Sequence, residues 1–332
     1  MTHDEIARHL DSLTKPPGSL GRLEELAARL CSIQASLAPR TRPRRLVVFA
    51  ADHGVVAEGV SAWPQAVTGL MVRNILAGGA ASSVLARSTD TELVLVDVGA
   101  ASDPLPPQAG YVVSRVRPGT RNLAREPALT VAEFDQAWEV GAGMARGAGA
   151  DGMRVVAAGE MGIGNTTAAA CLATLLTGTP VDHVVGRGAG ADDATLARKR
   201  AVVGAATRGR TPGKPAVVAV AGLEIAAMAG FYAAAAAAGL TVVLDGFIAT
   251  AAALVAETLA PGVRDHLIAA HRSAEPGHEP LLRALGVTPL LDSWQMRLGE
   301  GTGALAVMPL LDAAAAVVRE MATFDQAGIR AT

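Results

Sequence analysis

The sequence predicts an α/β protein whose strands form a mostly parallel sheet of β-α-β units. Continuous apolar runs alternate with segments of helical length, as is typical of parallel sheets buried on both faces. The expected strands are residues 46–51, 92–99, 153–160, 215–222 and 240–246. Four of these runs end in Asp, Glu or Gly, and ligands bind beyond the carboxyl ends of parallel strands. We therefore expect the functional site at that edge of the sheet.

Helices are expected between the strands and at both ends of the chain. Their ranges are 5–13, 20–33, 65–77, 80–87, 131–147, 166–176, 192–207, 224–238, 247–259 and 302–321. Ser19 or Gly18 is expected to cap the second helix, and Pro309 to kink or restart the last one. We predict a sheet domain over residues 45–290 and a small helical domain made of residues 1–44 and 291–332.

Composition excludes several classes of protein. Half of the 332 residues are apolar and 18% are charged, which argues against a disordered chain. The net charge of −2 and 3% aromatic content argue against nucleic-acid binding. Two distant cysteines suggest neither a disulfide framework nor a zinc site. No secretory signal is visible, and the apolar stretch 217–244 is mostly Ala and Gly, so we expect a cytoplasmic protein outside the membrane.

The most informative motif is GEMGIGNTT, residues 159–167, which follows an expected strand and opens a helix. Gly162 and Gly164 let the backbone approach a ligand, and free N–H groups at the helix start can bind an anion. Asn165 and Thr166 are expected to cap this helix. A tight turn that merely needs glycine is the alternative, but it does not explain Glu160 beside the loop.

A second glycine loop, GRGAGADD, precedes another helix, and Lys199 follows about two turns later. Gly188 and Lys199 would frame the same phosphate, with the lysine as its counter-charge. Taken alone, the pattern favours the alternative, a flexible loop that precedes a helix capped by Asp192 or Asp193, followed by a solvated lysine.

The motif HRSAEPGHEP contains two histidines, His271 and His278. Their separation across a Pro-Gly turn matches no standard zinc pattern, so we expect no metal there. The simpler interpretation is a polar turn in which Ser273 and Glu275 cap a helix.

The motif RLGEGTGA places Glu300 between Gly299 and Gly301, with Gly303 at a helix start. A carboxylate on a glycine turn can reach a ligand closely, and with Glu160 it makes a pair suited to acid–base chemistry. A glutamate that caps the helix N-terminus is the alternative.

The stretch ADHGVVAEGVSAWPQAVT could form a pocket for a flat ring. Trp63 and Pro64 would wall it, and Ser61 and Gln65 would orient the ring by hydrogen bonds. The alternative is an ordinary loop whose tryptophan fills a gap.

Together these motifs resemble the nicotinate-nucleotide–dimethylbenzimidazole phosphoribosyltransferase family of the cobalamin nucleotide-loop pathway. The matching stretches run from residue 13 to 329, and they add LTKPPGSLGRLEELA, GGAASSVLAR, LDGFIATAAAL and MATFDQAGI to the motifs above. Departures from the family pattern are Ala51, Ala221, Leu223 and Ala270. None of them removes a side chain assigned to chemistry.

The resemblance implies a Rossmann-like sheet, a small helical domain, a homodimer and transfer of phosphoribose from nicotinate mononucleotide to 5,6-dimethylbenzimidazole. By similarity, Glu300 is the catalytic base, and Glu160 stabilises positive charge near the ribosyl carbon. We assign phosphate and nucleotide binding to Gly162, Gly164, Asn165, Gly188, Lys199, Ser273, Gly299, Gly301 and Gly303. We assign base binding to Ser61, Trp63, Gln65 and Met161.

The implied reaction requires neither a metal nor a cofactor. Nicotinate leaves as a neutral ring from a pyridinium, and the substrate has no pyrophosphate to neutralise. A β substrate and an α product imply inversion by one direct displacement.

Two other functions fit parts of the sequence. A dinucleotide-dependent oxidoreductase needs G-x-G-x-x-G after the first strand, which instead ends in Ala-Asp-His-Gly. A non-catalytic nucleotide or corrinoid-pathway binding protein would keep the phosphate loops without needing Glu160 and Glu300, so the two carboxylates favour an enzyme.

Overall fold

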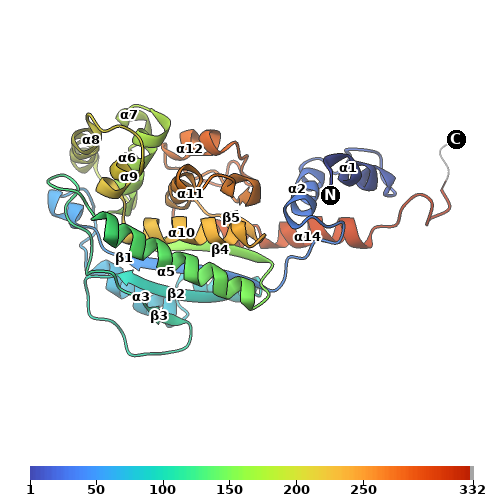
Figure 1. Ribbon diagram of the computed structural model, residues 1–332, viewed down its shortest axis with the longest axis horizontal. Coiled ribbons are helices and arrows are strands. Elements are labelled where there is room, and N and C mark those ends of the chain that lie inside the picture. The colour runs from blue at the N-terminus through green and yellow to red at the C-terminus, as the bar shows by residue number, and fades with distance from the viewer. Residues whose placement is uncertain (330–332) are drawn as a thin grey trace.

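The computed structural model describes residues 1–329, which fold around a six-stranded, fully parallel sheet (Figure 1). The strands are β1 (Arg44–Ala51), β2 (Glu92–Gly99), β3 (Tyr111–Val113), β4 (Val155–Met161), β5 (Thr241–Leu244) and β6 (Leu267–Ala269). Their order is β3-β2-β1-β4-β5-β6, the Rossmann order, and it reverses direction between β1 and β4. The predicted α/β class is confirmed.

Helices cover both faces of the sheet. The α-helices are α1 (His3–Ser12), α2 (Arg22–Gln34), α3 (Val67–Leu76), α4 (Ala81–Ser88), α5 (Val131–Ala150), α6 (Asn165–Thr177), α7 (Val181–Val184), α8 (Asp193–Thr207), α9 (Lys214–Val220), α10 (Leu223–Ala237), α11 (Phe247–Leu259), α12 (His278–Leu285), α13 (Thr302–Ala306) and α14 (Met308–Glu320). Short 3-10 turns are η1 (Gly54–Glu58) and η2 (Val263–His266). The last predicted helix restarts next to Pro309, as expected.

Alternate residues of β1 belong to two hydrophobic cores, because successive side chains of a strand point to opposite faces. Val47 and Phe49 pack in the core that contains α5, α6, α10 and α11. Leu46 and Val48 pack in the core that contains α2, α3, α13 and α14. The sheet is therefore buried on both sides, which explains its continuous apolar strands.

The prediction of a strand over residues 215–222 is wrong, because Lys214–Val220 forms helix α9. Residues 216–220 are buried all round, and a short buried run has no periodicity that separates strand from helix. Pro215 in the first turn suits a helix start. Strands β3 and β6 were not expected, since three residues are too few to show a pattern.

Three expected helix caps are also wrong. Gly21 caps α2 in place of Ser19 or Gly18, and Gly164 and Gly277 precede α6 and α12 without side-chain caps. Asn165, Thr166 and Glu275 instead form hydrogen bonds within the site described below. The cap of α8 by Asp192 is confirmed, since its carboxylate accepts the N–H of Thr195 at 2.8 Å.

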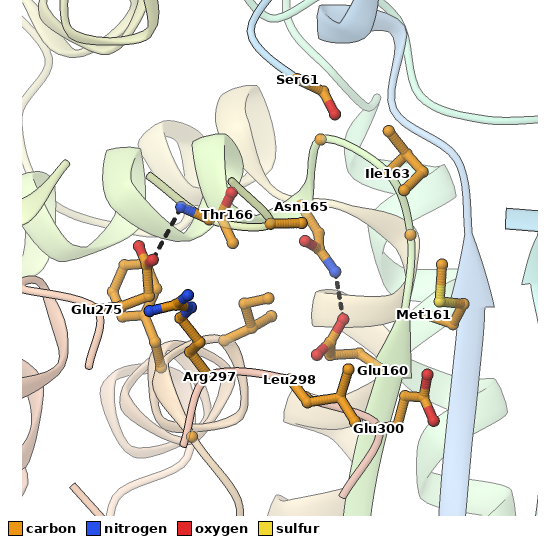
Figure 2. A pocket seen from close by; sticks show the side chains of 18 of the residues that line it. Ser61, Glu160, Met161, Ile163, Asn165, Thr166, Glu275, Arg297, Leu298 and Glu300 are labelled. Carbon is orange, nitrogen blue, oxygen red and sulfur yellow. Dashed lines mark hydrogen bonds between the residues drawn. The ribbon is translucent and has the colours of Figure 1, made fainter. Parts of the chain in front are cut away.

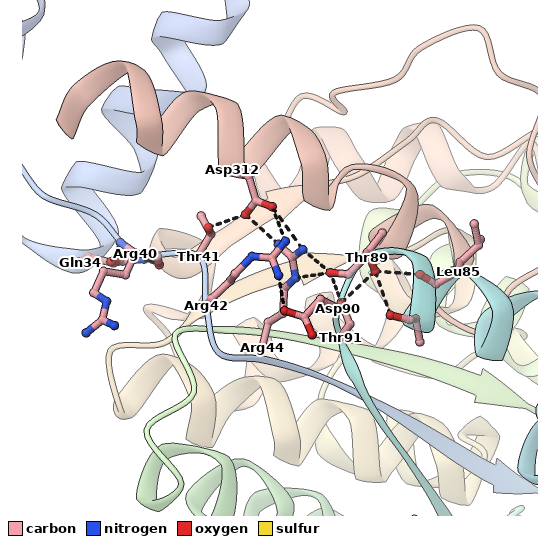
Figure 3. Close-up of polar contacts among 11 residues, drawn as sticks. Gln34, Arg40, Thr41, Arg42, Arg44, Leu85, Thr89, Asp90, Thr91 and Asp312 are labelled. Carbon is pink, nitrogen blue, oxygen red and sulfur yellow. Dashed lines mark hydrogen bonds and ion pairs between the residues drawn. The ribbon is translucent and has the colours of Figure 1, made fainter. Parts of the chain in front are cut away.

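The two ends of the chain come together, since α14 packs against α2 (Figure 1). A polar cluster ties α14 to the start of the sheet (Figure 3). Asp312 of α14 accepts hydrogen bonds from Thr41 and from the buried Arg44, and the Arg44 guanidinium also donates to the Thr89 carbonyl before β2. The domain boundaries at residues 45 and 290 stay a prediction.

One stretch, Val67–Ser88, has the length and hydropathy of a membrane span, with 33% of its window buried. In the structure it is two helices, α3 and α4, and both pack against the sheet. The stretch 217–244, which raised the same question in the sequence, is divided among α9, α10 and β5.

Candidate active site

A cavity of about 520 Å³ lies beyond the carboxyl ends of the strands, next to the β1–β4 reversal (Figure 2). This is where open α/β sheets bind ligands. Its walls come from the end of β4 and the start of α6, from the loop after β1, and from segments 187–189, 245–249, 271–275 and 297–300.

The cavity brings together most of the residues predicted from the sequence. These are Ser61, Trp63, Glu160, Met161, Gly162, Gly164, Asn165, Gly188, Lys199, Ser273, Gly299 and Glu300. Gln65, Gly301 and Gly303 do not line it. The N–H groups of the two glycines instead donate to Asp245, at 3.0 and 2.6 Å.

The glycine loop after β4 is held against β1. The N–H of Ile163 donates to Thr68 Oγ1 at 3.2 Å, and Thr68 donates to Asp52 at 2.7 Å. A Cβ at position 162 would overlap the Ala51 carbonyl oxygen, and Gly164 has a left-handed φ of +97°. Glycine at these two positions therefore allows a close turn that other residues would block.

Glu300 lies on the turn just before the N-terminus of α13, and its side chain is buried. Ser82 Oγ donates to its Oε2 at 2.9 Å. Burial raises the pKa of Glu300 above its usual value, Asp245 adds to the rise, and the hydrogen bonds from Ser82 oppose it. A glutamate with a raised pKa is suited to act as a base near neutral pH.

Glu160 is the second-to-last residue of β4 and is buried beside Glu300 in the wall of the cavity (Figure 2). The amide of Asn165 donates to its Oε2, which is why Asn165 does not cap α6. Burial raises the pKa of Glu160 well above its ordinary value, and the negative charges of Asp245, Glu224 and Glu300 raise it further. This end of the cavity is therefore rich in carboxyl groups.

The opposite end of the cavity contains the cations Lys199, Arg187 and Arg297 together with the buried carboxylate of Glu275. Lys199 is buried, and its Nζ donates to Thr166 Oγ1 at 2.8 Å and to the Gly186 carbonyl at 3.1 Å. Burial lowers the pKa of Lys199 to about 8. The N–H of Gly188 donates to Glu275 at 2.8 Å, so Glu275 holds the second glycine loop and does not cap α12.

Several residues of the site were missed in the sequence. Arg187 and Arg297 line the cavity, and Figure 2 shows Arg297 near Glu275, away from Glu160. Isolated arginines carry no sequence signal. Asp245 also lines the cavity, and its place near the end of the expected strand 240–246 could have pointed to it.

His278 is fixed by hydrogen bonds on both ring nitrogens. Its Nδ1 accepts the N–H of Ser273 at 2.8 Å, so Nε2 carries the proton and donates to Thr250 Oγ1, also at 2.8 Å. Burial lowers the pKa of His278 to about 3, which keeps the ring neutral. Within residues 1–329, His, Cys, Asp and Glu form no group of three or more placed to hold a metal ion.

Comparison with known proteins identifies the family. A family model described as "Phosphoribosyltransferase" matches residues 2–329. The chain belongs to this phosphoribosyltransferase family. Its predicted resemblance and its class as an enzyme are thereby confirmed.

Named relatives of this phosphoribosyltransferase are similar along almost their whole length. The nicotinate-nucleotide–dimethylbenzimidazole phosphoribosyltransferase of Thermus thermophilus is 52% identical over 323 residues, 96% of each chain. The protein of that name from Chromobacterium violaceum is 51% identical over 96% of this chain and 92% of its own. The crystal structure of CobT from Thermus thermophilus superposes with a TM-score of 0.95, covering 99% of both chains at 49% identity.

Proposed function

We propose that the chain transfers the phosphoribosyl group of nicotinate mononucleotide to 5,6-dimethylbenzimidazole, giving α-ribazole 5′-phosphate and nicotinate. One observation supports this most: a single cavity has two buried glutamates at one end and a basic, amide-rich surface at the other. That cavity belongs to a chain about half identical to relatives carrying the corresponding name.

The basic end suits the phosphate of the mononucleotide. Lys199 and Arg297 provide positive charges, Arg187 adds a third that also pairs with Asp193, and the N-terminus of α6 lines the same cavity. Gly162, Gly164, Gly188 and Ser273 line the same space and complete the proposed phosphate and ribose contacts. Ser61, Trp63 and Met161 are the proposed contacts of the benzimidazole ring.

The reaction is a displacement at C1′ of the ribose. The unprotonated nitrogen of the benzimidazole forms a bond to C1′ as the bond to the pyridinium nitrogen breaks, and nicotinate leaves with the electron pair. The other benzimidazole nitrogen then loses its N–H proton to Glu300. The raised pKa of Glu300 makes its carboxylate a stronger acceptor than an exposed glutamate.

Glu160 is proposed to face the positive charge of the pyridinium and of the developing ribosyl cation. Its raised pKa favours the protonated form when the cavity is empty. A cationic substrate reverses that balance, since an opposite charge nearby favours the ionised carboxylate. Binding of the substrate would then create the negative charge that the transition state uses.

Two features of the proposal concern the protein as a whole. By family resemblance we propose a cytoplasmic homodimer that uses no metal and no cofactor. Light scattering coupled to size-exclusion chromatography tests the dimer, with an expected mass of twice 33.6 kDa. A mass of one chain at all concentrations would contradict it.

The test of the function is product analysis. Purified protein with nicotinate mononucleotide and 5,6-dimethylbenzimidazole should give nicotinate and one riboside phosphate in equal amounts, and proton NMR should show an α anomer. No product, or a β anomer, would contradict the proposal. A nucleotide-binding protein without activity would bind the mononucleotide but release no nicotinate.

A further inference from the structure

Glu300 occupies a backbone conformation that a glutamate does not adopt without support. Its φ is +59°, and Gly299 and Gly301 on either side have φ of +88° and +78°. A non-glycine residue in the left-handed region is uncommon and costs free energy unless its surroundings hold it. The structure contains two such supports, one on the backbone and one on the side chain.

The backbone support is Asp245, which directly follows β5 and is buried. Its two carboxylate oxygens accept the N–H groups of Gly301 at 3.0 Å and Gly303 at 2.6 Å. Both donors lie just after Glu300, so one rigid strand end fixes the turn that carries it. A Cβ at Gly159 would overlap the Glu300 backbone, so the turn also rests directly on β4.

The side-chain support is Ser82, near the start of α4. Its hydroxyl donates to Glu300 Oε2 at 2.9 Å. Ala80 at the N-cap of α4 has no side-chain oxygen, and the Glu300 carboxylate supplies the negative charge that is favoured beside the first turn of a helix. Ser82 is fully buried and is absent from the lining of the cavity.

We propose that Asp245 and Ser82 are positioning residues that together clamp Glu300, one through the backbone of its turn and the other through its carboxylate. Neither exchanges a proton with the substrate. This inference rests on the proposed function, because fixing the position of the Glu300 carboxylate matters for the reaction only if Glu300 is the base. A small misplacement of a catalytic group can lower turnover by about 10²-fold.

The two residues shift the pKa of Glu300 in opposite directions. The negative charge of Asp245 raises the pKa of Glu300, whereas the hydrogen bonds from Ser82 lower it. Other titratable groups near this turn are Glu160 on β4, Tyr232 on α10, whose pKa is raised by burial and by Asp245 and Glu160, and His271 after β6, whose Nε2 is 3.6 Å from Asp245. Both substitutions keep these three groups, and Asp245→Asn also removes one charge that raises the pKa of Glu160.

The test uses the variants Asp245→Asn and Ser82→Ala in the full-length protein. Asp245→Asn keeps the shape but has one acceptor oxygen for two N–H donors, and Ser82→Ala removes one hydroxyl. We expect kcat to fall about 10-fold or more in each, with KM for nicotinate mononucleotide within about twofold of wild type. Ser83→Ala is the matched control: this neighbouring hydroxyl donates to the Ile75 carbonyl and leaves Glu300 untouched.

Two further readouts separate positioning from a loss of folding. The acid limb of the kcat profile should move to lower pH in Asp245→Asn and to higher pH in Ser82→Ala. In a Glu300→Gln background, either substitution should lower the residual rate by less than about threefold, because residues that act through one group are not additive.

The outcomes distinguish the clamp from the function beneath it. The clamp would be overturned if the two substitutions lowered kcat in the Glu300→Gln background as much as in the wild type. It would also be overturned if the acid limb of the kcat profile did not move. A wild-type protein that releases no nicotinate, or a Glu300→Gln variant with wild-type turnover, would instead overturn the proposed reaction or its base.

Discussion

Lys199 combines a positive charge with almost complete burial, and this makes its role testable. We predict that Lys199→Ala mainly raises KM for nicotinate mononucleotide, because a phosphate contact present in both ground and transition states contributes uniform binding. In the wild type, KM should also rise above about pH 8, where the free lysine loses its proton, and the variant should lack this rise.

Initial rates over substrate concentration and pH provide the measurement. The half-buried Lys214, which pairs with Asp135 and does not line the cavity, serves as the control, and Lys214→Ala should leave kcat and KM unchanged. An unchanged KM with a collapsed kcat in Lys199→Ala would show that the lysine acts in the chemical step.

The burial of Glu160 should make the free energy of unfolding depend on pH. Its pKa is raised in the folded protein, so the folded state binds the proton more tightly than the unfolded state. This contribution is complete below the ordinary pKa of 4.5 and is lost as pH rises through the folded value. Glu160→Gln removes the ionisation and keeps an oxygen for the amide of Asn165.

We therefore expect the Tm of Glu160→Gln to exceed that of the wild type by an amount that grows as pH rises above the ordinary pKa of 4.5. Thermal unfolding followed by circular dichroism at several pH values measures it. A difference that is constant with pH, or that shrinks, would mean that Glu160 ionises freely in the folded state.

Single site residues could be predicted from the sequence where a charged residue lies beside glycines. Glu160 and Glu300 stand out in the sequence for that reason, and the cavity contains both. Gln65 was not predictable in the same way, because a polar residue in a loop gives no sign of which way it points. The sequence does not show that Ser82 and Asp245 both contact the turn of Glu300, because the three segments meet only in the folded structure.

Helices α5 and α10 cross at close range, and one glycine in each helix makes this crossing possible. A Cβ at Gly141 of α5 would overlap the Ala227 carbonyl, and one at Gly230 of α10 would overlap the Trp138 carbonyl. Gly141→Ala should lower the free energy of unfolding by about 1–3 kcal/mol, as overpacking does.

Gly147 of the same helix has open space around its Cβ position and is exposed. Gly147→Ala should therefore raise the free energy of unfolding by about 0.5–1 kcal/mol, because alanine is the better helix former. Urea unfolding of both variants tests the pair. Equal effects of the two substitutions would contradict the close crossing.

Long elements with a clear period were predictable, and short buried ones were not. The strands 46–51 and 92–99 agree with β1 and β2 because they are apolar, β-branched and followed by turn residues. Helix α9 was mistaken for a strand because burial on all sides removes the polar face that reveals a helical period.

The whole molecule places Glu160 and Glu300 at one end of a cavity and Lys199 at the other, and the proposed reaction uses protein side chains alone. We predict that activity survives exhaustive treatment with EDTA. The phosphate charge is met by Lys199, by loop N–H groups and by the start of α6, and both ring nitrogens of His278 are already bonded. Assays before and after chelation provide the measurement. Loss of turnover that one divalent ion restores would contradict the metal-free mechanism.

The account depends most on Glu300 as the base that accepts the benzimidazole proton. Single-turnover release of nicotinate tests it directly, with enzyme in excess over nicotinate mononucleotide and 5,6-dimethylbenzimidazole added to start the reaction. Glu300→Gln should bind the mononucleotide like the wild type yet release nicotinate about 10²–10⁴-fold more slowly. A rate within about threefold of the wild type would contradict the claim and move the base to Glu160.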